Sequence, residues 1–92
     1  MTAIKPSDRP VQNGDVAARV IDGVAYLMDP DARELHALNE IGTRIFALVD
    51  GRRTVAEIVA AIIDEYDVAE EVARRDVGAF LDQLLQKSLI TV

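Results

Sequence analysis

The segment NEIGTRIFALVDGRRTVAEI, residues 39–58, contains two helix starts and one helix stop, and it separates strand-forming sequence from helix-forming sequence. Asn39 is a favoured N-cap because its side-chain oxygen can accept a hydrogen bond from a free N–H of the first helical turn. Gly51 is suited to the left-handed C′ conformation that ends a helix. Thr54 and Glu57 form the T-x-x-E capping box that starts the next helix. One helix between Asn39 and Gly51 and a second from Thr54 are therefore predicted.

Apolar residues recur with helical spacing in these two helices and in a third one, predicted from about Glu70 to Lys87. The pattern breaks between the second and third helices at Asp67-Val68. Residues 89–92 are apolar and β-prone, and we expect a short strand or an extended tail packed on the core. The predicted buried stripes consist of Ile41, Ile45, Leu48 and Val49, then Val55, Ile58, Val59, Ile62 and Ile63, then Val72, Ala73, Val77, Phe80, Leu81, Leu84 and Leu85.

Two β-prone runs, residues 16–21 and 24–29, are separated by Asp22-Gly23. Asp-Gly is a strong hairpin signal because both central residues of a type I′ turn need positive φ. Residues 34–38 largely alternate polar and apolar side chains and are predicted to form a third strand. Three short antiparallel strands followed by three helices indicate an α+β domain, and the tight turn between the first two helices describes a winged helix-turn-helix-like fold.

The first part of the chain has a different character. Residues 1–15 are polar, show no periodicity and contain Pro6, Pro10 and Gly14. We therefore expect a flexible N-terminal arm over residues 1–15 and a single folded domain over residues 16–92.

Residues that carry catalytic or metal chemistry are scarce. His36 is the single histidine and the chain has no cysteine, which argues against a zinc site. The sequence contains neither a G-x-S-x-G nucleophile elbow nor a glycine-rich phosphate loop. We expect a protein that is not an enzyme, with no catalytic residue, no metal site and no cofactor.

The charge balance argues against nucleic acid as a partner. The formal net charge is −6, and the third helix carries four acids against three bases. The doublets Arg52-Arg53 and Arg74-Arg75 make a weak basic patch, whereas DNA readers need a positive face to neutralise phosphates. No apolar run approaches the ~20 residues that cross a bilayer, so a cytoplasmic protein without a membrane partner is expected.

An ordered set of short motifs runs through the chain: a strand ending in Asp-Pro, then Leu-Asn, an aliphatic helix, Asp-Gly, T-x-x-E-I, a tyrosine and DV-x-x-FL-x-x-L. These motifs comprise Tyr26, Leu27, Met28, Asp29, Pro30, Leu38, Asn39, Ile45, Leu48, Asp50, Gly51, Thr54, Val55, Ala56, Glu57, Ile58, Tyr66, Asp76, Val77, Phe80, Leu81 and Leu84. In this order they resemble the PqqD family, and the resemblance extends over about residues 16–92.

The resemblance implies a peptide chaperone, or recognition element, for ribosomally made precursor peptides of pyrroloquinoline quinone synthesis or a related pathway. Such domains bind the leader of the precursor as a strand added beside the third strand, in a groove closed by the third helix. They present it to a modifying enzyme, commonly a radical SAM protein. By position, the expected peptide-binding residues are Glu34, Leu35, His36, Ala37 and Leu38 of the strand, and Val72, Arg75, Asp76, Ala79, Phe80 and Gln83 of the helix.

The helical positions have different expected roles, and the sequence leaves open which flank of the third helix faces the groove. Ala79 would leave space for a leader side chain, Phe80 would offer apolar contact, and Arg75 would pair with an acidic leader. Two other functions remain open: a DNA-binding regulator of the same fold, and a docking module that uses the acidic connection around residues 65–71. An exposed sheet edge also leaves room for a homodimer.

Overall fold

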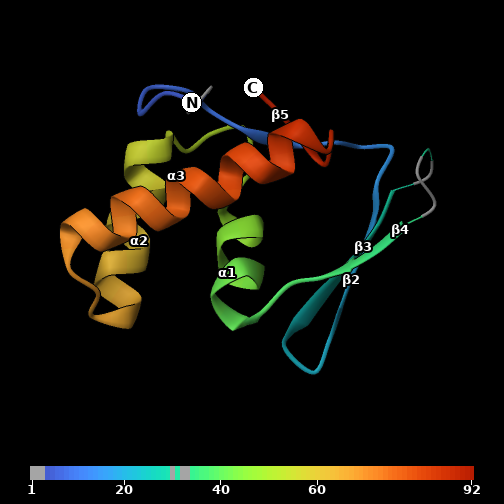
Figure 1. Cartoon of the computed structure of the whole chain (residues 1–92), viewed down its shortest axis with the longest axis horizontal. Coiled ribbons are helices and arrows are strands. Elements are labelled where there is room, and N and C mark those ends of the chain that lie inside the picture. The colour runs from blue at the N-terminus through green and yellow to red at the C-terminus, as the bar shows by residue number, and fades with distance from the viewer. Residues whose placement is uncertain (1–3, 30, 32–33) are drawn as a thin grey trace.

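The computed structural model describes residues 4–29, 31 and 34–92, and its main elements follow the order expected from the sequence (Figure 1). Three antiparallel strands form a sheet in the order β2-β3-β4, and three helices follow. Two further short strands, β1 and β5, pair with each other. The predicted α+β, winged helix-turn-helix-like fold is confirmed. The elements are β1 (Val11–Gln12), β2 (Ala17–Ile21), β3 (Val24–Asp29), β4 (Glu34–Ala37), α1 (Glu40–Leu48), α2 (Val55–Tyr66), α3 (Glu70–Gln86) and β5 (Ile90–Thr91).

The hairpin between β2 and β3 has the predicted turn. Asp22 and Gly23 both have positive φ, 52° and 79°, as a type I′ turn requires. Ile21 lies opposite Val24 at the closed end of the hairpin. This two-residue turn fixes the register of the hairpin, because loop length determines which residues of the two strands face each other.

The predicted helix starts are confirmed. Asn39 caps α1, with its side-chain oxygen 2.7 Å from the backbone nitrogen of Gly42. Thr54 and Glu57 form the reciprocal capping box of α2, and the backbone N–H of Thr54 is the main cause of a lowered pKa at Glu57. Asp67 ends α2 in the left-handed conformation, with φ 51°. These local bonds satisfy helix-end groups that the helix itself leaves without partners.

The predicted role of Gly51 was wrong in one respect. Gly51 does have a positive φ of 79°, but α1 ends at Leu48 with Val49 as its C-cap. The glycine lies beyond the cap, and its N–H donates to the carbonyl of Pro10 at 2.9 Å. The positive φ of Gly51 therefore accompanies a hydrogen bond to the N-terminal segment, and Gly51 does not close the last turn of α1.

The N-terminal segment also differs from the flexible arm expected over residues 1–15. From residue 4 onward it lies on the helices, and Ile4 is only 5% exposed. The N–H of Ile4 donates to the side chain of Asp82 in α3 at 3.0 Å. The carbonyls of Pro6 and Asp8 accept the N–H groups of the first two residues of α2, Ala56 and Val55. This segment thus completes the capping of α2, a role that separate prolines and one isoleucine do not signal in sequence.

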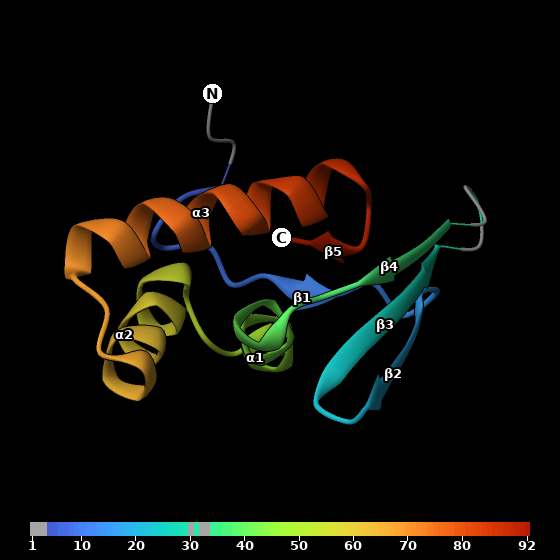
Figure 2. The same ribbon diagram turned by 60° about the horizontal axis from the view of Figure 1, so that its bottom comes forward.

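The apolar core lies among the three helices, and β3 is the strand that enters it. Ala25 and Leu27 of β3 are essentially buried, as are Leu89 and Ile90 near the C-terminal end of the described chain. All five residues of β2 are exposed. Figures 1 and 2 both show the β2-β3 hairpin projecting from the helical part as a wing. The sheet is therefore attached to the helices along only part of its surface.

An ion pair joins α1 to α2 on the outer surface. The guanidinium of Arg44 donates two hydrogen bonds to the carboxylate of Glu65, at 2.7 and 3.0 Å. These bonds lower the pKa of Glu65 and raise the pKa of Arg44. Because the pKa of Glu65 is lower in the folded state, the ion pair's contribution to stability is fully present at a pH above the unfolded-state pKa of Glu65. This contribution is lost as the pH falls through the folded-state pKa. An exposed pair of this kind contributes little to stability.

No helix in the described part of the chain is both long and apolar enough to cross a lipid bilayer.

We predict that Ile4→Ala lowers the free energy of unfolding by about 2 kcal/mol, the low end of the cost of truncating a buried aliphatic side chain. Urea denaturation measures this change, and Ser7→Ala in the exposed part of the same segment is the matched control. An Ile4→Ala protein as stable as the control would show that the segment does not pack on the core in solution.

Candidate functional site: a groove between β4 and α3

Strand β4 forms one edge of the sheet, and the hydrogen-bonding alternation determines which of its groups face outward. The N–H of Leu38 donates to the carbonyl of Ala25 at 2.9 Å, just beyond the end of β4. Residues directly opposite in an antiparallel ladder alternate between bonded and non-bonded pairs. His36 opposite Leu27 is therefore the next bonded pair. The N–H and C=O groups of Leu35 and Ala37 point away from the sheet, toward a site where another strand could pair.

A threonine hydroxyl holds the junction where the chain leaves β4 and enters α1. The N–H of Ala25 donates to the hydroxyl oxygen of Thr43 at 2.9 Å. The same hydroxyl lies 3.3 Å from the carbonyl oxygen of Leu38 and donates to it. Thr43 is thus inserted where a direct bond between the two strands would otherwise form. It joins the sheet to α1 and fixes the direction in which β4 runs past the helices.

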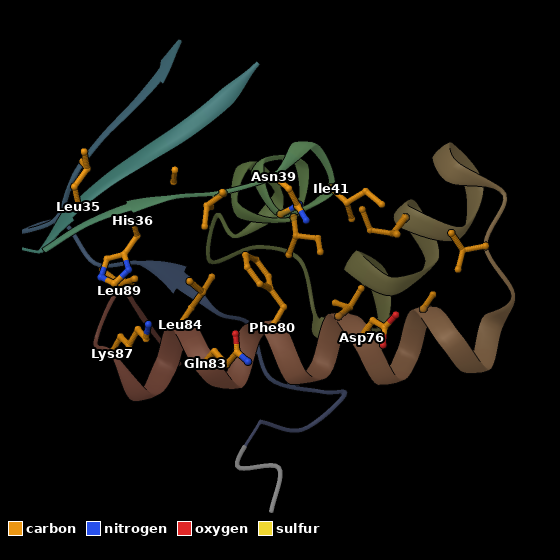
Figure 3. Close-up of a pocket in the computed structure, with 18 residues that line it drawn as sticks. Leu35, His36, Asn39, Ile41, Asp76, Phe80, Gln83, Leu84, Lys87 and Leu89 are labelled. Atoms are coloured by element: carbon orange, nitrogen blue, oxygen red, sulfur yellow. The ribbon is translucent and has the colours of Figure 1, made fainter. Parts of the chain in front are cut away.

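A groove of about 620 Å³ lies between β4 and α3 (Figure 3). One wall is β4 and the start of α1, and the other is one face of α3 and its C-cap, which carry Asp76, Phe80, Gln83 and Lys87. These four residues are spaced by four, three and four positions, so they lie in one row along the helix. Apolar side chains deepen the groove between the walls, among them Ile41, Ile45, Val77, Leu84 and Leu89.

The structure brings together seven of the eleven residues that the sequence proposed as peptide-binding, and it identifies the flank of α3 that faces the groove. The seven that line it are Leu35, His36, Ala37, Leu38, Asp76, Phe80 and Gln83. The other four are absent from its walls; these are Glu34, Val72, Arg75 and Ala79.

The four residues outside the groove have other positions. Ala79 and Val72 are exposed on α3, so the expectation that Ala79 leaves space for a leader side chain does not fit its place. Arg75 is exposed and forms an ion pair with Asp76, Nε to Oδ1 at 3.3 Å. Glu34 lines a separate hollow near Asp29. The helical repeat in the sequence predicts which face of α3 is buried. It does not predict which of the two flanking faces lies opposite β4.

Several groove residues were missed by the sequence reasoning. Lys87 lies four positions after Gln83, so extending the row by one helical turn would have found it. Asn39, Ile41 and Gly42 come from the start of α1 and its N-cap, which continue the wall formed by β4. Ile41 was assigned to the core, but it remains 39% exposed because its side chain opens into the groove.

The two ends of the groove differ in charge, and most of the residues between them are apolar. Asp76 lies toward the start of α3, and Lys87 and His36 lie at the end where β4 begins (Figure 3). The Nε2 atom of His36 is buried without a hydrogen-bond partner in the described structure, and Oε2 of Glu34 is 3.4 Å away. Among the described residues, no group of three His, Cys, Asp or Glu side chains could hold a metal ion. The geometry is that of a binding groove for an extended segment with apolar side chains.

Comparison with known proteins agrees with this geometry. The family model described as Coenzyme PQQ synthesis protein D (PqqD) matches residues 25–90. The chain belongs to the PqqD family. The match covers β3 apart from its first residue, β4, all three helices and the first residue of β5. It therefore includes both walls of the groove. None of the curated proteins compared with the chain matches it.

Solved structures extend the comparison. TbiB1 in complex with the TbiA(beta) leader peptide is 30% identical, with a TM-score of 0.80 over 87% of this chain and 93% of that chain. The solution structure of the PqqD truncation of Methylobacterium extorquens PqqCD is 27% identical, with a TM-score of 0.79 over 99% and 97% of the two chains. That protein is described as a functional and stand-alone recognition element for ribosomally synthesised and post-translationally modified peptides (RiPPs). A lasso peptide synthetase B1 complexed with the leader peptide shares the fold at 19% identity, with a TM-score of 0.80 over 91% and 99% of the two chains.

We predict that Thr43→Val destabilises the protein by about 1–3 kcal/mol, because the N–H of Ala25 and the carbonyl of Leu38 lose the hydroxyl that bonds them. Thr43→Ser, which keeps the hydroxyl, is the control and should retain most of the stability. Chemical denaturation of the two variants provides the comparison. Equal stability of the valine and serine variants would mean that the hydroxyl does not hold the junction.

Proposed function

We propose that this protein binds the leader segment of a ribosomally synthesised precursor peptide as a strand added to the open edge of β4. The observation that carries the proposal is the position of this edge beside an apolar groove. An added strand would gain main-chain hydrogen bonds from Leu35 and Ala37, and alternate side chains would enter the groove. Backbone pairing supplies affinity, and the groove supplies selectivity.

The opposite edge of the sheet supports the assignment by contrast. By the same alternation, Ala18 and Val20 of β2 direct their N–H and C=O groups outward. Both residues are exposed, and neither lines the groove. A peptide paired with β2 would gain main-chain bonds without the apolar wall that α3 provides beside β4. The groove therefore favours one edge of the sheet over the other.

The related structures support the ligand class. TbiB1, the 30% identical relative, is described in complex with a leader peptide, and the Methylobacterium extorquens protein as a recognition element. We extend leader-peptide recognition to this chain because its family match includes both walls of the groove.

Once the leader is bound, the protein acts as a non-catalytic chaperone. It presents the precursor to a separate modifying enzyme of the radical SAM type, in pyrroloquinoline quinone synthesis or a related pathway. It acts in the cytoplasm, where ribosomally made precursors first become available. Because β4 is an open edge, a second copy of the protein is the competing occupant, and a titration with leader peptide distinguishes the two.

The charges on α3 favour a peptide over DNA. The guanidinium of Arg74 bonds to Glu70 at 2.6 Å, and that of Arg75 pairs with Asp76. Two of the cations that a DNA-reading helix would direct at phosphates thus already face carboxylates. Phosphate neutralisation by free cations is the main source of DNA affinity.

We predict that Ala37→Pro weakens leader binding at least tenfold, because proline removes an outward N–H that the β3-β4 ladder does not use. The measurement is a fluorescence-anisotropy titration with a labelled leader peptide whose binding to the wild-type protein has first been established. Ala18→Pro is the matched control, since it removes an outward N–H from the opposite edge.

Unchanged affinity in a folded Ala37→Pro protein would contradict strand addition at β4. An equal loss of leader affinity in Ala37→Pro and Ala18→Pro would mean that proline weakens binding by disturbing the whole sheet, and not by removing a donor at β4. If the wild-type protein is a dimer that the leader neither binds nor dissociates, and Ala37→Pro is a monomer, the edge pairs with a second copy.

A further inference from the structure

Phe80 occupies the middle of the groove wall formed by α3. Its side chain is partly buried, and its ring points from α3 toward the start of α1, beside Asn39 and Ile41 (Figure 3). The ring therefore lies across the groove, between α3 and the first turn of α1. Its position determines how much space is left between α3 and β4 for a side chain of a bound peptide.

Gly42 in the first turn of α1 is the residue against which this ring rests. A Cβ atom built at Gly42 would lie 3.1 Å from Cζ and 3.4 Å from Cε1 of Phe80. It would also lie 3.0 Å from Oδ1 of the N-cap residue Asn39. These separations are tighter than ordinary van der Waals contact, so a methyl group at position 42 would require the ring to shift by a few tenths of an ångström.

The backbone of Gly42 does not itself require glycine. Gly42 is absent from the positive-φ residues, which among the described glycines are Gly23 and Gly51. Glycine within a helix destabilises it by roughly 0.5–1 kcal/mol relative to alanine. The absence of a side chain at this position is thus explained by the close approach of Phe80 and of the Asn39 cap.

A methyl group at position 42 would displace the ring toward the open side of the groove. The backbone of α1 is held by the Asn39 cap and by the Thr43 hydroxyl, so the partly exposed ring is the part free to move. Its displacement would narrow the space between α3 and β4. A small peptide side chain would still fit there, whereas a large one would be crowded and would bind less tightly.

We propose that Gly42 and Phe80 together set the size of the apolar leader side chain that the groove admits. This inference rests on the proposed leader-binding function and deepens it. The chemical class of ligand is an extended peptide with a large apolar residue, such as leucine or phenylalanine, opposite Phe80. Ile41, Ile45 and Leu84 line the groove around this position and supply the apolar contact.

The test compares Gly42→Ala with Gly78→Ala, a matched substitution in a helix. A Cβ atom at Gly78 meets nothing within 4 Å, so this control changes helix propensity without touching Phe80. The probes are peptides selected from a random phage-displayed library against the wild-type protein. Each probe is then resynthesised with alanine, valine, leucine or phenylalanine at the position that enters the groove.

We expect Gly42→Ala to weaken binding of the leucine and phenylalanine probes about tenfold, the low end of what a small change in an apolar pocket produces. The alanine probe should bind the variant and the wild type within about twofold, the limit of additivity for independent sites. Gly78→Ala should leave the ranking of the four probes unchanged.

A double-mutant cycle separates the ring from the cap. Phe80→Leu removes Cζ and Cε1, the two atoms next to position 42, and keeps an apolar side chain. In the Phe80→Leu background, Gly42→Ala should no longer alter the ranking of the probes. An equal effect of Gly42→Ala in both backgrounds would overturn the inference, because the methyl group would then act through Asn39.

The size limit and the function on which it rests fail in different ways. Probes that bind at β4 with a size ranking unaffected by Gly42→Ala would refute the size limit and leave leader binding intact. If the selection yields no peptide that perturbs the amides of β4, the leader-binding function and the size limit are both overturned.

Discussion

The groove depends on the junction where β4 ends and α1 begins. At this point the sheet makes its last direct bond, from Leu38 to Ala25, and the Thr43 hydroxyl takes the place of the next one. Asn39 then caps α1 immediately after Leu38. The β2-β3 hairpin projects away from the helices (Figures 1 and 2), so this junction and the buried Ala25 and Leu27 of β3 hold the sheet, and with it β4, beside the helices. A change in its geometry would tilt one wall of the groove against the other.

The opposite wall is fixed by a different part of the chain. The N-terminal segment bonds to Asp82 on α3 through Ile4, and its carbonyls accept N–H groups from the first turn of α2. It thereby joins the two helices. Asp82 is almost buried, whereas its neighbour Gln83 lines the groove, so the same turn of α3 is held on one side and open on the other. Rigid walls lower the ordering cost when a flexible peptide binds.

Local signals predicted the fold well, since each one acts within a few residues. The Asp22-Gly23 turn and the Asn39 and Thr54 caps act on residues nearby in the chain, so each can be predicted from the local sequence. The packing of the N-terminal segment could not be predicted in this way. Its contacts with Asp82 and Gly51 join residues far apart in the chain, and a lone isoleucine among polar residues gives no periodic signal.

The candidate site was predictable in part for the same reason. The family resemblance and strand order located β4, but the helical repeat of α3 was compatible with either flank facing it. The Gly42–Phe80 contact was beyond sequence reasoning, because a glycine in a helix gives no sign of which distant side chain needs its space. The relation to leader-binding proteins agrees with the groove without identifying its side-chain preferences.

Amide hydrogen exchange, measured by NMR with and without a bound leader peptide, tests strand addition at β4 most directly. If the peptide pairs with β4, the N–H groups of Leu35 and Ala37, which face outward from the sheet, will exchange more slowly when it is bound. Those of Ala18 and Val20 on the opposite edge should keep their free-state rates. Protection confined to the β2 edge, or peptide binding with no change at Leu35 and Ala37, would contradict strand addition at β4.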